Sequence, residues 1–152
     1  IKYKKKDIEN LSSKFNKIIL KKIIQLKLNK GVLTFLKKNK STFQYFISSG
    51  TPEKELKYII KKKGIENYFL KIYGSPKEKH KHIEEIIKSF KFKKKNVVFI
   101  GDGLSDLEAA KKIKLKFIQV GDNFKSKYVK YKIKYFYELE KLIKLKKIFN
   151  IN

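Results

Sequence analysis

The fold of this chain is decided by the stretch VVFIGDGLSD, which occupies residues 97–106. Its first four residues form a continuous apolar run, and such a run is typical of a strand that is buried on both faces of a parallel sheet. A glycine-flanked turn follows the run, and a helical pattern begins directly after the turn. We therefore expect a strand over residues 96–100 and a helix over residues 105–113.

Two carboxylates stand where this strand and this helix meet. Asp102 leaves the strand end and Asp106 lies in the first helical turn, so the two can face one shallow basin. Neighbouring carboxylates repel each other unless a cation neutralises them, and Mg²⁺ with oxygen ligands suits such a pair. Only four aspartates occur in the chain, which makes two of them in one motif informative. A purely structural role stays open, because Ser105 and Glu108 have capping-box spacing and the helix dipole favours Asp106 in any case.

Strands and helices alternate along most of the chain. Sequence patterns predict strands at residues 43–48, 70–73, 96–100 and 116–120, and helices at residues 52–63, 77–90 and 105–113. Towards the two ends they predict an amphipathic helix or helix pair over residues 8–28, a short helix after Gly31, and a short strand followed by a helix within residues 131–149. This alternation predicts an α/β fold with a mainly parallel sheet, whose ligands bind beyond the carboxyl ends of the strands.

A second polar group follows the strand at residues 43–48. The hydroxyl of Ser49, with the backbone N–H groups of Gly50 and Thr51, could cradle an anion at a helix N-terminus. The alternative is that Thr51 is only an N-cap and Pro52 the favoured first helical residue. Further along, Lys79 enters a helix after the strand at residues 70–73, where its ammonium could balance phosphate and carboxylate charge.

The two histidines carry less information. His80 and His82 are two residues apart on a predicted helix, so they face different directions, and no third metal ligand is near in sequence. We interpret them as solvated surface residues. Asp122, which follows Gly121, is interpreted as a turn residue.

Composition excludes several classes of protein. The chain has 152 residues, 41% of them hydrophobic, which fits one domain with a core. Cysteine is absent, so a disulfide scaffold, a thiolate zinc site and a cysteine nucleophile are excluded. No apolar run is long enough to span a membrane and no signal-type cleavage pattern occurs, so we expect a cytoplasmic location and no membrane partner.

The charge of the chain invites a nucleic-acid interpretation. The formal net charge is +26, and all 40 basic residues are lysines. Clustered cations bind polyanions by releasing counterions, but the arginine fork that reads guanine is missing. Abundant Lys, Ile, Asn, Phe and Tyr together are typical of an AT-rich genome. We therefore attribute the charge to composition, and a lysine-rich nucleic-acid-binding module remains the alternative from another class.

Three motifs, in their order and spacing, resemble the haloacid dehalogenase-like (HAD) hydrolase superfamily, in particular its phosphoglycolate phosphatase-like branch. They are SGTP at residues 49–52, Gly74-Ser75-Pro76 with Lys79, and GDGLSD at residues 101–106. The resemblance covers about residues 30–121. It implies a three-layer Rossmann-like core over residues 31–152 and the remnant of a helical cap over residues 1–30.

The resemblance also implies a role for each candidate residue. Ser49, or Ser48 if the strand end is shifted by one, would hydrogen-bond a phosphoryl oxygen beside Gly50. Lys79 would steady the negative charge, Asp102 would bind Mg²⁺, and Asp106 would support that metal site. The implied reaction is Mg²⁺-dependent hydrolysis of a small phosphomonoester through an aspartyl-phosphate intermediate. A phosphotransferase or mutase with the same chemistry, or a non-catalytic HAD-like protein, are the alternatives within the fold.

One departure from the family pattern is large. The family's nucleophile is an aspartate in an Asp-x-Asp segment after a buried strand, and the chain has no such segment. In the family this strand is central, between the serine strand and the strand that ends at Asp102. The chain begins with Ile1 and contains no methionine, so we expect a fragment without that strand, the nucleophile and most of the cap. Such a fragment should be inactive and poorly stable, because two rows of backbone groups lack a strand partner.

Overall fold

The computed structural model describes residues 5–144. The strands are β1 (Tyr45–Pro52), β2 (Phe69–Ser75), β3 (Val98–Gly101), β4 (Lys116–Val120) and β5 (Tyr131–Ile133). The helices are α1 (Lys5–Gln25), α2 (Val32–Lys38), α3 (Glu53–Lys62), α4 (Lys79–Ser89), α5 (Leu104–Ile113) and α6 (Tyr137–Lys144). Two short 3₁₀ helices, η1 (Glu66–Tyr68) and η2 (Lys94–Asn96), precede β2 and β3.

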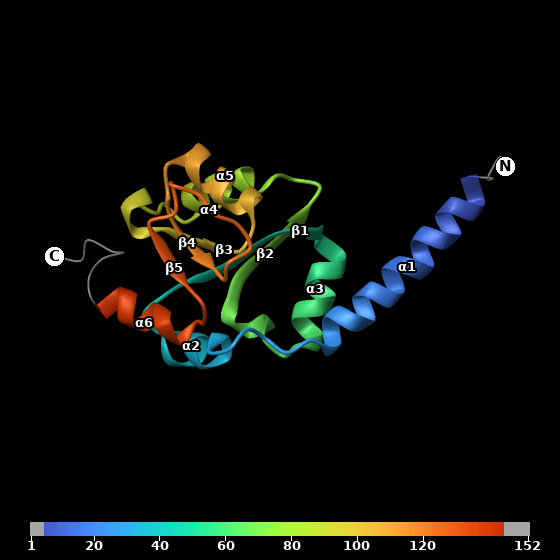
Figure 1. The fold of residues 1–152 in the computed structure, drawn as a ribbon, viewed down its shortest axis with the longest axis horizontal. Coiled ribbons are helices and arrows are strands. Elements are labelled where there is room, and N and C mark those ends of the chain that lie inside the picture. The colour runs from blue at the N-terminus through green and yellow to red at the C-terminus, as the bar shows by residue number, and fades with distance from the viewer. Residues whose placement is uncertain (1–4, 145–152) are drawn as a thin grey trace.

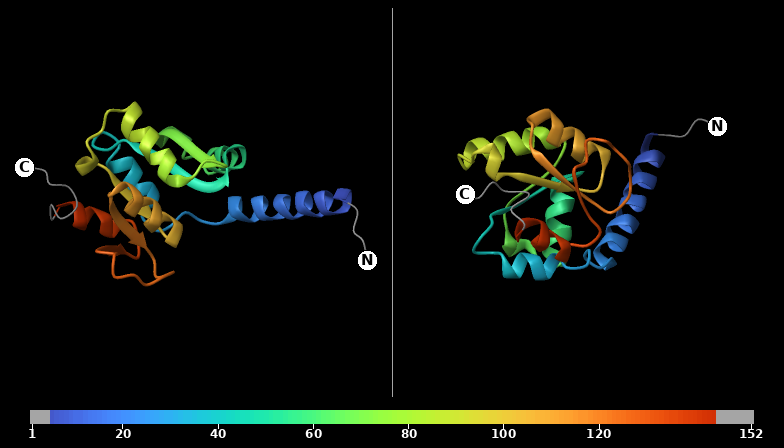
Figure 2. Two further views of the ribbon diagram at one scale, coloured as in Figure 1. Left: turned by 90° about the horizontal axis from the view of Figure 1, so that it is seen from above. Right: turned by 60° about the vertical axis from the view of Figure 1, so that its left-hand side comes forward.

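The elements form three layers. The strands make the middle layer, α4 and α5 cover one side, and α2 and α6 cover the other (Figure 1). Helix α3 lies beside β1 and β2, whereas α1 projects away from the body of the molecule in every view (Figure 2). No described helix is both long and apolar enough to cross a membrane. The α/β prediction is confirmed.

The strands belong to two small sheets. One sheet has the order β1-β2 and the other the order β3-β4-β5, and every pairing is parallel. Within residues 5–144, no strand lies between β1 and β3. This arrangement is expected of a Rossmann-like core without its central strand. Strands β1 and β3, which flank this gap in the middle layer, each pair only with their outer neighbour in the described chain.

Most element boundaries agree with the sequence patterns, and residues 8–28 form a single helix over most of their length. The main difference is β1, which extends to Pro52 instead of ending at Ser48. Pro52 itself occupies the N-cap position of α3, with φ −51° and ψ 134°. The alternative that Thr51 caps this helix is therefore wrong, because the extended strand continues through Thr51.

The core is apolar but interrupted. Ile118 of β4 and Ile133 of β5 are buried together with Phe35 of α2 and Leu139 of α6. In contrast, residues 98–100 of β3 stay half-buried, although their continuous apolar run predicted burial on both faces. The reason is that, among residues 5–144, no strand pairs with the edge of β3 that faces β1.

The close contact between β2 and α3 gives a stability prediction. A Cβ atom at Gly74 would lie 2.4 Å from Glu53 Cα and 2.5 Å from Glu53 N, and backbone cannot move aside as a flexible side chain can. Gly74→Ala should therefore lower the free energy of unfolding by about 1–3 kcal/mol, as overpacking does. The measurement is urea unfolding followed by circular dichroism.

Gly50→Ala is the matched control, because a Cβ atom there meets nothing within 4 Å. The control should change the free energy of unfolding by less than about 0.5 kcal/mol. Equal stabilities of the two variants would contradict the described packing of β2 against α3.

Candidate active site

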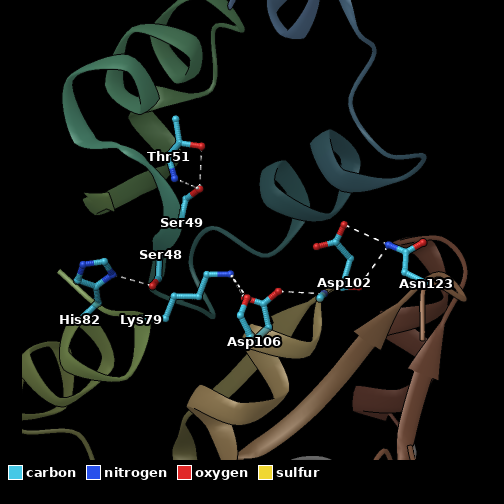
Figure 3. Close-up of polar contacts among 10 residues, drawn as sticks. Ser48, Ser49, Thr51, Lys79, His82, Asp102, Asp106 and Asn123 are labelled. Atoms are coloured by element: carbon cyan, nitrogen blue, oxygen red, sulfur yellow. Dashed lines mark hydrogen bonds and ion pairs between the residues drawn. The ribbon is translucent and has the colours of Figure 1, made fainter. Parts of the chain in front are cut away.

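Polar side chains from four segments gather at the carboxyl ends of β1 and β3 (Figure 3). Ser48 and Ser49 lie on β1, Lys79 is the first residue of α4, Asp102 is in the turn after β3, and Asp106 lies in the first turn of α5. Lys79 lies between the serines of β1 and the carboxylate of Asp106 (Figure 3). The structure therefore brings the sequence-predicted residues to one edge of the divided sheet.

The strongest interaction at this edge is an ion pair between Lys79 and Asp106. Lys79 Nζ lies 2.7 Å from Asp106 Oδ1, and the two side chains are only 20% and 8% exposed. The same ammonium donates to Ser105 Oγ at 3.1 Å. Because Lys79 follows β2 and Asp106 follows β3, the pair connects the two sheets at the edge where ligands of α/β folds bind.

Asp106 also caps its own helix. Its Oδ2 accepts a hydrogen bond from Gly103 N at 3.0 Å, and Gly103 is the N-cap residue of α5. The expected capping box of Ser105 and Glu108 is therefore wrong, since α5 starts at Leu104 and Asp106 occupies the third helical position. Gly101 permits this arrangement, because a Cβ atom there would lie 2.5 Å from Asp106 Cγ.

Asp102 is the exposed carboxylate of the site. Asn123 Nδ2 donates to Asp102 O at 3.2 Å and lies 3.4 Å from Asp102 Oδ2. No sequence pattern indicated Asn123, although it follows β4 and the carboxyl ends of neighbouring parallel strands meet at one edge. With Asp106 bound to Lys79 and Gly103, Asp102 is the acidic side chain of this motif that faces solvent.

Ser49 is held in place by its own strand end. Thr51 N donates to Ser49 Oγ at 3.1 Å, and Ser49 Oγ lies 3.2 Å from Thr51 Oγ1. Ser49 is half-buried and Gly50 is exposed. The hydroxyl therefore has a fixed position beside an accessible backbone amide, a combination that can donate hydrogen bonds to an anion.

The histidines differ from the sequence interpretation. Both His80 and His82 are buried, at 6% and 0% exposure, so the expectation of solvated surface residues is wrong. His82 Nδ1 lies 2.8 Å from Ser48 Oγ, and its ring stacks on Tyr73 at 5.3 Å. Helix α4 thus presents this histidine to β1 and β2, which spacing along one helix could not reveal. Ser48 is engaged with His82, whereas Ser49 points away from that histidine (Figure 3).

Burial has an electrostatic consequence for His82. Burial of the ring, with a smaller contribution from the Lys77 ammonium, lowers the pKa of His82 below its ordinary value of 6.5. The imidazole is therefore neutral at pH 7 and forms its hydrogen bond with Ser48 without adding positive charge next to Lys79.

The residues at this edge fit Mg²⁺ in a limited way. Among residues 5–144, no three His, Asp or Glu side chains form a metal-binding group. Mg²⁺, however, keeps several waters and uses one or two carboxylates together with substrate phosphate oxygens. Asp102, the exposed carboxylate of the motif at residues 101–106, meets that requirement, while Asp106 contacts Lys79 and Gly103.

Comparisons with known proteins identify the family and the fold of the chain. A family model described as haloacid dehalogenase-like hydrolase matches residues 1–120. No curated protein matches the chain. Among solved structures, a predicted phosphoglycolate phosphatase from Haemophilus somnus 129PT has a TM-score of 0.81 at 15% identity, covering 93% of this chain and 69% of that chain.

Two further solved structures have the same fold. A haloacid dehalogenase-like hydrolase from Streptococcus pneumoniae has a TM-score of 0.75 at 18% identity, covering 93% of this chain and 72% of that chain. A HAD phosphatase from Thermococcus onnurineus has a TM-score of 0.71 at 20% identity, covering 85% of this chain and 64% of that chain. At these identities the structural likeness establishes the fold.

The neutral, buried state of His82 gives a pH prediction. Since the unfolded chain binds a proton at this residue more readily than the folded chain, the free energy of unfolding should fall as the pH is lowered from about 7.5 through 6.5 to about 5.5. His82→Gln keeps a polar group near Ser48 and cannot titrate, so its stability should fall less steeply. The pKa values of Glu53 and Glu85 are lowered from 4.5, so these carboxylates titrate below this window.

The measurement is urea unfolding of both proteins at each pH. Identical slopes for the unsubstituted protein and His82→Gln would show that His82 takes up a proton equally well in the folded chain, and would contradict its neutral state.

Proposed function

Because the chain belongs to the haloacid dehalogenase-like hydrolases, we propose that it is the phosphate-handling part of a Mg²⁺-dependent phosphatase. The proposed substrate is a small phosphomonoester, such as phosphoglycolate or a sugar phosphate, in the cytoplasm. The observation that carries the proposal is the exposed carboxylate of Asp102 beside the Lys79–Asp106 ion pair, at the edge where the hydroxyl of Ser49 is fixed.

Charge at this edge favours a divalent cation. Asp102 and Asp106 supply two carboxylates and Lys79 one ammonium, so the three groups carry one net negative charge. This net negative charge repels a phosphate dianion. One divalent ion bound at Asp102 would make the net charge of the group positive, so that the group attracts the dianion. The ion, when bound, supplies electrostatic stabilisation of the phosphoryl oxygens.

Each remaining residue has a proposed role in the reaction. Ser49 Oγ and Gly50 N would donate hydrogen bonds to phosphoryl oxygens and orient the phosphorus. Lys79 Nζ, one of whose partners is Asp106, would offset charge that develops on those oxygens. An aspartate outside these 152 residues would attack phosphorus and release the alcohol, which takes up a proton. Water would then cleave the resulting phosphoaspartate to give free phosphate.

A phosphotransferase or mutase would use the same residues, with an acceptor hydroxyl in place of water. The nucleic-acid alternative requires a concentrated cationic face. Lysines instead occupy the last turns of α1, α2, α3, α4 and α5, on several sides of the molecule. This distribution favours the compositional origin of the charge.

The role of Asp102 is tested by its substitution in a protein that joins these residues to a segment with the nucleophile. Asp102→Asn should lower Mg²⁺-dependent phosphate release by at least about a hundredfold, because the exposed carboxylate of the motif is lost. Asp122→Asn is the matched control, because Asp122 is 80% exposed, pairs with Lys132 and has no proposed role in the reaction; it should retain activity.

Residues 1–152 alone allow a second measurement. Titration with MgCl₂ should shift the amide resonances of residues 101–103, and Asp102→Asn should abolish those shifts. Unchanged turnover of Asp102→Asn in the joined protein would contradict the proposed role of this carboxylate.

A further inference from the structure

Strand β1 departs from regular pairing at the candidate site. Two regular pairs, Ser48 with Tyr73 and Pro52 with Ser75, frame residues 49–51 of β1. On β2 only one residue lies between the members of these pairs, so residues 49–51 form a bulge. Bulges beside active sites re-aim side chains. This bulge carries the hydroxyl and the amides that the proposed function assigns to phosphate, so whatever fixes the bulge also fixes the anion-binding groups.

His82 contacts both members of the pair from which the bulge starts. Its Nδ1 atom lies 2.8 Å from Ser48 Oγ, and its ring stacks on the ring of Tyr73 with 5.3 Å between the two centroids. His82 is 0% exposed, so it is not accessible to a substrate. Its influence on the site therefore passes through the two strands on which it packs.

Helix α4 connects this contact with the ion pair of the site. Lys79 and His82 are three positions apart, so they lie on one face of the helix. Lys79 reaches Asp106 of α5 at 2.7 Å, whereas His82 reaches Ser48 of β1 at 2.8 Å (Figure 3). One turn of α4 therefore holds β1 and α5 at a fixed spacing, and with it the spacing between the bulge and the motif at residues 101–106.

Stability does not account for a histidine at this position. Its Nε2 atom is buried and, within the described part of the chain, has no hydrogen-bond partner, which costs free energy. A phenylalanine could stack on Tyr73 without that cost. The apolar ring would lack only the hydrogen bond to Ser48, which is directional and so determines how the end of the strand is placed.

We propose that His82 is a positioning residue, which fixes the bulge at residues 49–51 through its contacts with β1 and β2. The bulge in turn holds the Ser49 hydroxyl at a set distance from the ammonium of Lys79. Ser48 orients the strand end and does not touch the phosphate. The effect on phosphate binding rests on the proposed function, whereas the effect on the bulge does not.

Amide hydrogen exchange in residues 1–152, without any ligand, tests the positioning itself. Thr51 N donates to Ser49 Oγ inside the bulge, so exchange of this amide reports whether the bulge keeps its geometry. Either Ser48→Ala or His82→Phe removes the hydrogen bond between the two side chains. In each variant, exchange of the Thr51 amide should become at least about fivefold faster. Unchanged exchange in both variants would overturn the proposal.

His80→Phe is the matched control on the same helix. His80 is also buried, but its described polar partner is Glu78, whose Oε2 atom lies 3.0 Å from His80 Nδ1. This substitution should leave the exchange of Thr51 unchanged. Equal acceleration in His80→Phe and His82→Phe would show a general loosening of α4 and would overturn the proposal.

The double variant Ser48→Ala/His82→Phe separates one shared hydrogen bond from two independent effects. Because both substitutions break the same bond, the double variant should accelerate exchange of Thr51 no more than either single variant does. Its thermal stability should match that of the unsubstituted protein, since replacing both hydrogen-bonding partners by apolar groups is nearly neutral. Acceleration equal to the product of the two single effects would overturn the proposal.

Inorganic phosphate is the probe for the effect on binding. Titration of residues 1–152 in the presence of MgCl₂, followed by the amide resonances of residues 49–51, gives a dissociation constant. His82→Phe should weaken binding about fivefold. His82→Asn places an amide group where histidine has Nδ1, so it should restore binding although it loses the stacking on Tyr73 and therefore stability. Every variant keeps all the lysines, so non-specific attraction of phosphate affects them equally.

The outcomes distinguish this proposal from the proposed function. If Ser49→Ala binds phosphate as tightly as the unsubstituted protein, the proposed anion cradle is wrong, while the exchange of Thr51 still decides the role of His82. If Ser48→Ala weakens phosphate binding and His82→Phe does not, Ser48 binds phosphate itself and the positioning role is wrong. Binding that simply follows thermal stability, weak in His82→Asn and unchanged in His82→Phe, would also overturn the proposal.

Discussion

The hydrogen-bonding requirement of two facing strand edges governs this structure. A parallel strand directs half of its backbone groups to each side, and those groups need partners when they are removed from water. β1 and β3 each have a strand on one side only in the described chain. Their apolar side chains therefore remain half-buried, and the core is split into clusters that helices on both faces hold together.

Polar contacts at one end of the gap between β1 and β3 hold the two sheets together. The Lys79–Asp106 pair is largely shielded from water, so solvent screens it less than it screens the exposed pairs of the surface. Asp106 in turn fixes the start of α5 through Gly103, and the turn that contains Asp102 lies immediately before it. The position of the exposed carboxylate thus depends on an ion pair that reaches across the divided sheet.

The sequence predicted the parts of the fold that depend on local pattern. The apolar run at residues 97–100, the glycine turn and the following helix were found where expected, because period and turn chemistry determine them locally. The end of β1 and the burial of His82 were not predicted, because both depend on contacts between elements far apart in the chain. His82 is buried only because α4 places its ring on Tyr73 and Ser48.

The division into two sheets also explains why the candidate site lies at one end of the gap between β1 and β3. In the family pattern a strand lies between β1 and β3; running parallel to both, it would end at the edge where Ser49, Lys79 and Asp102 lie, since the carboxyl ends of β1 and β3 meet there. The residue that follows this strand would lie among a fixed hydroxyl, an ammonium and an exposed carboxylate. The proposed reaction needs its attacking aspartate at that place. Completion of the sheet and completion of the active site are therefore one structural requirement.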